Sequence, residues 1–140
     1  MADPTLSERL RDAMNAHDLE AFVACFHQDY DSRQPAHPAR SFVGKDQVRK
    51  NWSLLFESIP DFRAELVRLA VQDGVEWAEW HWQGTKANGM PLDERGVMLM
   101  GIRDGLVAWG RLYVEEVEQV PVGIDETVAR MAGRMDPPTD

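Results

Sequence analysis

The sequence has few of the residues that cross-link very small domains. Its 140 residues include one cysteine and four histidines, and these form no Cys/His cluster of the kind that binds a metal. Cys25 follows Ala24 in an apolar helical pattern, which is typical of a buried structural thiol. With 44% hydrophobic residues, the chain is expected to fold as one domain around an ordinary apolar core, without disulfides or metals.

Long apolar runs and clusters of basic residues are also absent. No segment approaches the roughly 18 apolar residues of a membrane span, and residues 1–11 lack the apolar core of a signal peptide. We therefore expect a cytoplasmic protein that does not enter a membrane. Lys and Arg number 15 against 24 Asp and Glu, and the resulting net charge of −9 argues against nucleic acid as a partner.

Two helices are expected near the start of the chain. Thr5 and Glu8 have the spacing of a capping box, and apolar residues then recur at helical intervals, so the first helix is predicted over residues 6–16. Asp18 is the N-cap candidate of a short second helix, whose apolar stripe continues to Phe26.

An extended rim and a third helix follow. Pro35 and Pro38 remove backbone donors, so residues 30–42 are predicted to be extended chain and loop that could border a pocket. Gly44 opens the most amphipathic segment, which Pro60 ends.

The rest of the chain is strand-like and is divided by three turn dipeptides, which favour the positive φ angles of tight hairpins: Asp73-Gly74, Asn88-Gly89 and Asp104-Gly105. A meander of four strands results. The fold class is therefore α+β, with a curved antiparallel sheet wrapped around three N-terminal helices.

The domain is expected to span residues 1–118. Residues 119–140 form a peripheral or disordered tail, in which a short helix fits residues 125–131.

Two-residue hairpins would set the register across the sheet. They place three rows of side chains on one face: Ala70, Trp77, Met100 and Trp109; Arg68, Glu79, Met98 and Arg111; Leu66, His81, Gly96 and Tyr113. The opposite face is nearly all apolar, with Val67, Leu69, Ala78, Trp80, Trp82, Val97, Leu99, Ala108, Leu112 and Val114. One face must enclose the core. Composition alone permits either face, and we expect the mixed rows to line a pocket.

Several segments resemble, in order and spacing, the SnoaL-like group of the nuclear-transport-factor-2-like superfamily, which includes the ketosteroid isomerases. They are Phe42-Val-Gly-Lys-Asp-Gln-Val-Arg with Trp52, Ile59-Pro-Asp-Phe62, Trp80-His-Trp-Gln-Gly-Thr85, Arg95-Gly-Val-Met and Ile102-Arg-Asp-Gly-Leu-Val-Ala-Trp109. The resemblance covers roughly residues 6–118. It implies a cystatin-like cone whose interior is a pocket.

The resemblance implies a site but not a reaction, because the superfamily contains isomerases, epoxide hydrolases, polyketide cyclases, dehydratases and members without known activity. The first carboxylate of the ketosteroid isomerases falls here on Gln34 and the second near Gly96. No Asp-Arg-Asp set resembles the epoxide hydrolases. In this superfamily the outer sheet face often meets a second subunit, so an apolar outer face predicts a homodimer.

Four side chains on the mixed face are candidates for catalysis. His81 is the best acid/base candidate because an imidazole can both take up and release a proton, although a hydrogen-bonded core histidine fits equally well. Glu79 could act as a base and Arg111 could stabilise an enolate or bind a carboxylate, or the two could belong to a structural ion-pair network. Tyr113 could donate to an oxyanion or simply pack.

Apolar side chains around these residues suit a flat or terpenoid-like ligand, and core packing explains them as well. The candidate substrate contacts are Trp52, Phe56, Trp77, Met98, Met100 and Trp109, with Gln34 and His37 on the rim. Glu79 and His81 alone provide too few ligands for a metal site, and no cofactor motif appears in the sequence.

The function expected from the sequence is therefore acid/base chemistry on a small apolar molecule: isomerisation, cyclisation, dehydration or hydrolysis. A non-catalytic ligand-binding or dimerisation module is the alternative, because the isomerase and hydrolase carboxylates are missing.

Overall fold

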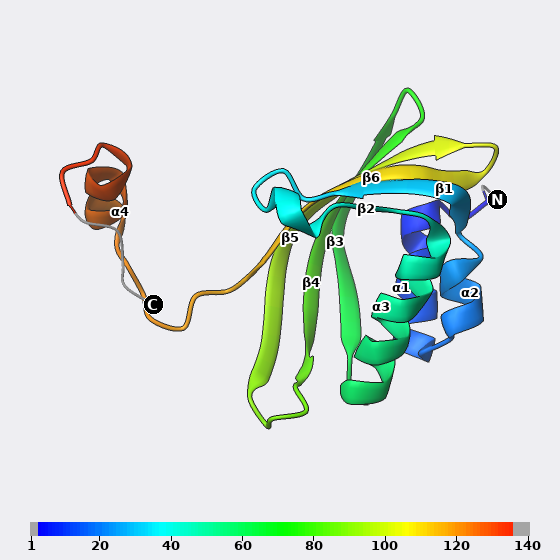
Figure 1. Ribbon diagram of the computed structural model, residues 1–140, viewed down its shortest axis with the longest axis horizontal. Helices are drawn as coiled ribbons and strands as arrows, with labels where there is room; N and C mark the ends of the chain where they lie inside the picture. Colours follow the sequence, from blue (N-terminus) through cyan, green and yellow to red (C-terminus); the bar gives the residue numbers. More distant parts are fainter. Residues whose placement is uncertain (1–2, 136–140) are drawn as a thin grey trace.

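Six strands form one curved sheet, and three helices pack against its concave face (Figure 1). The computed structural model describes residues 3–135. The helices are α1 (Leu6–Ala16), α2 (Leu19–Val23), α3 (Lys45–Ser58) and α4 (Ile124–Met131), with a 3₁₀ turn at Pro38–Arg40. The strands are β1 (Phe26–Arg33), β2 (Phe42–Val43), β3 (Arg63–Gln72), β4 (Val75–Thr85), β5 (Pro91–Arg103) and β6 (Leu106–Glu116). Their order in the sheet is β2-β1-β6-β5-β4-β3, which confirms the α+β class.

The helices begin where their capping residues predict. Glu8 donates its backbone N–H to Thr5 Oγ1 (3.1 Å), and Thr5 donates its own N–H to Glu8 Oε1 (2.9 Å), so the capping box at the start of α1 is confirmed. Asp18 accepts from the backbone N–H of Ala21 (3.0 Å) and caps α2. Gly44 precedes α3 with a φ of 103°, a backbone conformation that side chains other than glycine's rarely adopt.

The segment after α2 was wrongly assigned in part, because it forms a strand. Residues from Phe26 onward belong to β1, which runs parallel to β6, with Phe26 opposite Val107. The backbone N–H of Val107 donates to Cys25 O (2.8 Å) at the point where the chain leaves α2. Phe26 lies four residues after Phe22 and thus continues the helical stripe, which concealed the strand. The sheet is antiparallel in every pair except β1–β6.

Two of the three expected hairpins have the expected register. Gln72 pairs with Val75 and Arg103 with Leu106, and both turns have positive φ angles at their Asp-Gly dipeptides. The prediction for Asn88-Gly89 is wrong. The last pair there is Thr85 with Pro91, and the wider loop of residues 86–90 is closed by a hydrogen bond from Lys86 N to Met90 O (2.8 Å).

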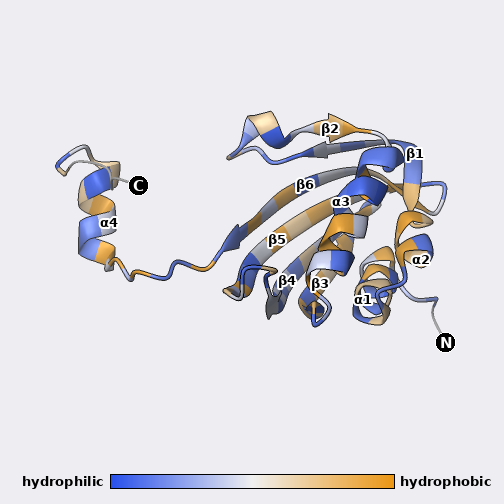
Figure 2. Cartoon of the chain, turned by 60° about the horizontal axis from the view of Figure 1, so that its bottom comes forward, coloured by the Kyte–Doolittle hydropathy of each residue, from blue (hydrophilic) through white to orange (hydrophobic). Residues whose placement is uncertain are grey.

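The wider loop shifts β5 by one residue relative to β4, so Glu79 lies opposite Val97 and not Met98. A further irregularity between Gly101 and Ile102 shifts β6, and Met98 faces Leu112 instead of Arg111. Each one-residue shift exchanges the two faces of a strand. The methionines of β5 therefore leave the predicted mixed rows and join the concave face, whose side chains are Ala64, Ala78, Trp80, Trp82, Met98, Met100, Leu112 and Val114. Figure 2 shows apolar and polar residues alternating along these strands.

The end of the chain forms a separate helix. Within α4, Ile124, Val128 and Met131 are exposed at helical spacing and no residue is buried. The expected helix is thus confirmed, while the peripheral nature of residues 119–140 stays a prediction, and residues 136–140 lie outside the described part. Among residues 3–135, no helix has the length and apolar character needed to cross a membrane.

A buried carboxylate joins the sheet to the first helix. Glu76 on β4 is 4% exposed, and its oxygens accept hydrogen bonds from the backbone N–H groups of Leu6 (3.0 Å) and Ser7 (2.8 Å) and from Ser7 Oγ (2.6 Å). The N-terminal N–H groups of a helix have no partners within the helix, and the helix dipole favours negative charge there. Glu76 therefore holds α1 against β4.

We expect Glu76→Gln to lower the free energy of unfolding by about 1–3 kcal/mol. The glutamine NH₂ group would face one of the N–H or O–H groups whose hydrogen bonds the carboxylate accepts, and two donors cannot form a hydrogen bond. Urea unfolding followed by circular dichroism measures this loss. The matched control is Glu79→Gln on the same strand, whose side chain is half-exposed and whose ion pair with Arg68 should contribute less than about 1 kcal/mol. Equal stability of the two variants would contradict the role of Glu76.

Candidate functional site

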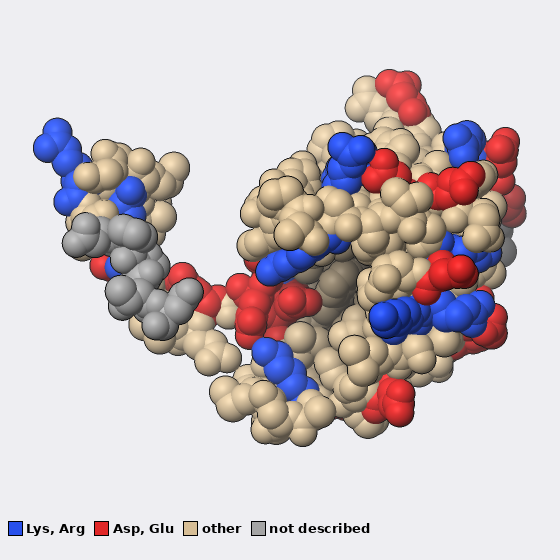
Figure 3. Space-filling view, viewed as in Figure 1, with Lys and Arg blue, Asp and Glu red and all other residues tan. Residues whose placement is uncertain are grey.

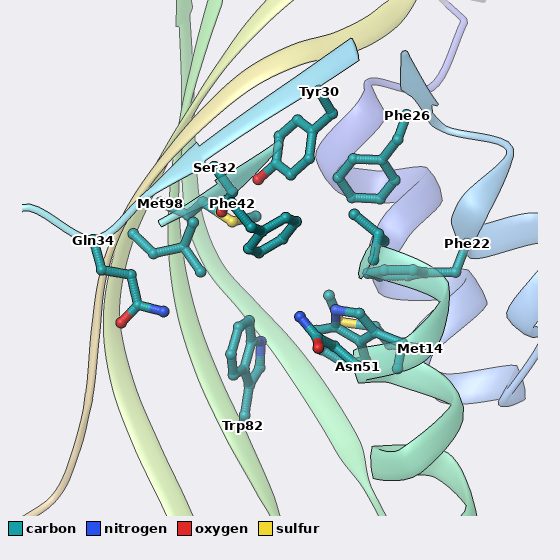
Figure 4. A pocket seen from close by; sticks show the side chains of 13 residues that line it. Met14, Phe22, Phe26, Tyr30, Ser32, Gln34, Phe42, Asn51, Trp82 and Met98 are labelled. Atoms are coloured by element: carbon teal, nitrogen blue, oxygen red, sulfur yellow. The ribbon is translucent and has the colours of Figure 1, made fainter. Parts of the chain in front are cut away.

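The concave side of the sheet and three helices enclose a cavity of about 90 Å³. Its walls come from α1, α2 and α3 on one side and from β1, β2, β4, β5 and β6 on the other (Figure 4). The lining residues are Met14, Phe22, Phe26, Tyr30, Ser32, Gln34, Phe42, Val48, Asn51, Trp52, Trp82, Met98 and Leu112. The cavity is not closed on all sides, and Figure 3 shows a hollow in the surface between clusters of acidic and basic side chains.

Aromatic rings form most of the wall, and Trp52 on α3 lies at their centre. Its ring centroid is 4.5 Å from that of Phe22 and 5.6 Å from that of Trp82, which it meets nearly edge-on at 85°. The ring centroid of Phe62 lies 5.5 Å from that of Trp52, and the two rings meet edge-on. Such tilted and edge-on pairs are favourable for aromatic rings, so the wall is rigid before any ligand enters.

Tyr30 and Ser32 close one end of the cavity from β1. The ring of Tyr30 packs against Phe26 with a centroid distance of 4.8 Å. Its hydroxyl occupies the space that a side chain on Gly110 would need, since a Cβ there would lie 2.3 Å from Tyr30 Oη. Burial raises the pKa of Tyr30, and a hydrogen bond with Ser32 acts in the opposite direction. The phenol is therefore a neutral hydrogen-bonding group at neutral pH.

Polar contacts hold the rim in place. Arg40 Nη1 donates to Gln34 Oε1 (3.1 Å), which fixes the orientation of the Gln34 amide because a guanidinium only donates. His37 Nε2 lies 2.8 Å from Glu115 Oε1 and ties the rim to the end of β6. The rim that Pro35 and Pro38 predicted is thus built onto the sheet.

One carboxyl group faces the concave side near this rim. Glu94 on β5 lies directly opposite Trp82 on β4 and Glu116 on β6, and it shares the face of Met98 because side chains alternate along a strand. Burial raises the pKa of Glu94, and the negative charge of Glu116 raises it further. A carboxyl in this environment keeps its proton to higher pH than an exposed one.

The four predicted catalytic residues lie on the opposite, convex face. Glu79 faces Arg68 (3.6 Å), and His81 Nε2 lies 2.7 Å from Asp93 Oδ1. Arg111 lies over the ring of Trp109, and Tyr113 is 46% exposed. The structure does bring these four side chains to one face, but the prediction that this face lines the pocket is wrong. The two register shifts add up to two residues between β4 and β6, so Glu79 is aligned with Tyr113 instead of Arg111 and the four side chains keep a common face. The helices cover the other side of the sheet.

The predicted ligand contacts divide between the two faces. Trp52, Met98 and Gln34 line the cavity. Phe56 packs behind Trp52 with a centroid distance of 5.6 Å, and Met100 is fully buried further along the concave face. Trp77 and Trp109 lie on the convex face, and His37 is on the rim.

Sequence reasoning missed several lining residues. Tyr30 and Ser32 were placed in a segment of extended chain and loop and were not named as lining residues, although their spacing of two is the signal of a strand with one buried face. Asn51 is a polar residue beside Trp52 on the apolar side of α3, and its position was visible in the helical pattern. Trp82 was assigned to the wrong face. Within residues 3–135, no group of three or more His, Cys, Asp or Glu side chains is placed to hold a metal ion.

A curved sheet that encloses a lined cavity against its helices defines the cone-fold class. The family model of the SnoaL-like domain matches residues 7–109, and the chain therefore belongs to the SnoaL-like domain family. This confirms the resemblance. None of the curated protein sequences compared with the chain matches it.

Solved structures share the fold at low sequence identity. AclR, a putative hydroxylase from Streptomyces galilaeus, is 16% identical with a TM-score of 0.70, over 91% of this chain and 90% of its own. A ketosteroid isomerase-like protein from Catenulispora acidiphila in complex with trimethylamine is 13% identical (TM-score 0.67, 79% and 85%). RV0760c from Mycobacterium tuberculosis in complex with estradiol-17beta-hemisuccinate is 16% identical (TM-score 0.66, 77% and 89%). At these identities the likeness establishes the fold alone.

Proposed function

We propose that this protein binds a small apolar molecule in its cone cavity. The observation that supports this most strongly is the preformed aromatic wall around Trp52, which leaves space instead of closing into a filled core. Concave, mostly apolar cavities with a few polar groups are the usual form of small-molecule sites. The small ligands bound by two proteins of the same fold support the same reading. Of the contacts expected from the sequence, Trp52, Met98 and Gln34 belong to this site.

The size of the cavity restricts the ligand. Its volume of about 90 Å³ is smaller than the roughly 150 Å³ dry cavity that accommodates benzene in another protein. A ligand with one ring therefore extends toward the rim, between Gln34 and Phe42, and a larger ligand has to displace these side chains. Single-ring compounds are the appropriate first probes.

Filling the cavity should abolish binding. We expect Leu112→Trp, which directs an indole into the cavity from β6, to remove the rise in thermal unfolding temperature that single-ring compounds such as toluene produce in the wild type. The matched control is Tyr113→Trp, one residue further on the convex face, which should leave the rise unchanged. Retained binding by a folded Leu112→Trp protein would place the ligand elsewhere.

A second candidate function is proton transfer by Glu94, which would make the protein an enzyme for acid/base chemistry on the bound molecule. The supporting observation is a half-buried carboxyl with a raised pKa that lies opposite Trp82, a residue of the cavity lining, without itself lining the cavity. The carboxylate form can take a proton from a carbon next to a carbonyl group and return it to the resulting enolate. No cavity role is assigned to the convex-face residues Glu79, His81, Arg111 and Tyr113.

Deuterium exchange tests this chemistry. We expect the protein to speed the exchange of the α-hydrogens of cyclohexanone in D₂O and Glu94→Gln to slow it about a hundredfold. The rate should rise with pH as Glu94 loses its proton, with a midpoint above the usual glutamate pKa of about 4.3, because burial favours the protonated form. NMR measures the exchange. The control is Glu57→Gln on the exposed side of α3, and an equal rate in Glu94→Gln would exclude this role.

The convex face supports a homodimer. Apolar side chains lie next to one another across β4, β5 and β6, among them Trp77 (48% exposed), Val97, Leu99 and Tyr113. A contiguous apolar patch on an otherwise charged surface is typical of a protein–protein contact. Pairing of this face with its copy would bury it in a two-fold interface.

We expect the protein to sediment with twice its chain mass of 15.9 kDa. Val97→Arg places a charge at the centre of the apolar patch in both copies, so it should produce a monomer with an unchanged circular dichroism spectrum. The matched control is Leu54→Arg, because Leu54 is exposed on α3, away from the convex face. A monomeric wild type, or a dimer that Val97→Arg leaves intact, would refute this interface.

A further inference from the structure

The indole N–H of Trp82 has no hydrogen-bond acceptor among the described residues, although the side chain is only 7% exposed. Trp82 lines the cavity from β4. A buried donor without a partner costs about 1–3 kcal/mol, so such groups are rare in native proteins. Among the residues that line the cavity, Trp82 is the one with a buried side-chain donor that has no partner in the described part of the chain, so this donor marks the position at which a ligand atom would accept a hydrogen bond.

Two amide groups flank this donor and also turn their nitrogen atoms toward the cavity. Gln34 Oε1 is occupied by Arg40 Nη1 (3.1 Å), and Asn51 Oδ1 is occupied by Gln47 Nε2 (2.8 Å). The groups left for a ligand are therefore the two NH₂ groups. Figure 4 shows both nitrogens on the sides of their amides that face the indole of Trp82.

None of the residues that line the cavity is charged. The lining therefore contains no carboxylate to pair with a cationic ligand and no basic side chain to pair with an anionic one. The hydroxyl groups of Tyr30 and Ser32 are the other polar groups of the lining. Around Trp82, by contrast, the groups left for a ligand are N–H donors.

From this set we infer that the ligand is a neutral apolar molecule with an exposed acceptor oxygen, such as a ketone or a quinone, and that Trp82 Nε1–H donates to that oxygen between the amides of Gln34 and Asn51. The inference rests on the proposed binding function and specifies its ligand class. A site with buried donors rejects an analogue that lacks the acceptor, because the donors then stay unpaired. Trp82 is thus a specificity-determining residue.

Three ring compounds of nearly equal size separate the alternatives. Cyclohexanone carries the acceptor, methylenecyclohexane replaces its oxygen by a CH₂ group, and cyclohexylammonium carries a positive charge that aromatic faces would attract. The ketone loses more hydration on entering an apolar cavity than the hydrocarbon does. A cavity without donors would therefore prefer the hydrocarbon, and a preference for the ketone requires a hydrogen bond.

The test is titration of the ¹⁵N-labelled full chain with each compound, followed through the indole N–H signals of its five tryptophans. We expect cyclohexanone to bind at least about fivefold more tightly than methylenecyclohexane and to move the Trp82 indole proton downfield. Trp82→Phe identifies that signal and keeps an aromatic ring in the wall. It should abolish the preference for the ketone while methylenecyclohexane still binds.

The matched control is Trp77→Phe on the convex face of the same strand, which should leave the preference unchanged. Equal binding of ketone and hydrocarbon to the wild type, or tightest binding of cyclohexylammonium, would overturn the inference while leaving the proposed binding function in place. Binding of none of the three compounds would refute both. The wild-type comparison decides the question even where Trp82→Phe fails to fold.

Discussion

The antiparallel pairing of β4 with β5 determines what this protein encloses. Paired residues point to the same side of a sheet, and the helices cover only one side, so the pair Ala78–Met98 places Trp82 inside and Glu79 outside. A shift of one residue would exchange the faces of β5. The composition of the cavity therefore depends on the loop of residues 86–90, although none of these residues lines the cavity.

Two buried polar groups on β4 illustrate how the enclosed side is used. Glu76 accepts hydrogen bonds from two backbone N–H groups and a hydroxyl of α1, so its charge is compensated and it stabilises the contact between helix and sheet. Trp82 has a donor without an acceptor, six residues further along the same face. Trp80, between them, also has a buried donor without a partner, but only Trp82 lines the cavity in which we propose that a ligand binds.

The residues that looked most reactive in the sequence lie on the convex face of the sheet and do not line the cavity. Glu79 with Arg68 and His81 with Asp93 are cross-strand pairs or neighbours on the convex face, and partly exposed pairs of this kind contribute little to stability. Their residue types suggested catalysis, but the environment of a side chain determines its chemistry. Glu94 attracted no notice in the sequence, and burial and the negative charge of Glu116 raise its pKa.

The sequence by itself determined the helix starts at Thr5, Asp18 and Gly44 and the turns at Asp73-Gly74 and Asp104-Gly105. These depend on capping hydrogen bonds and φ preferences that act within a few residues. The family resemblance added the cone and its cavity. Only the tertiary structure decided which sheet face is enclosed and that β1 joins β6 in parallel. Such features depend on the register added up over three hairpins and on contacts between segments about 80 residues apart, which no local pattern encodes.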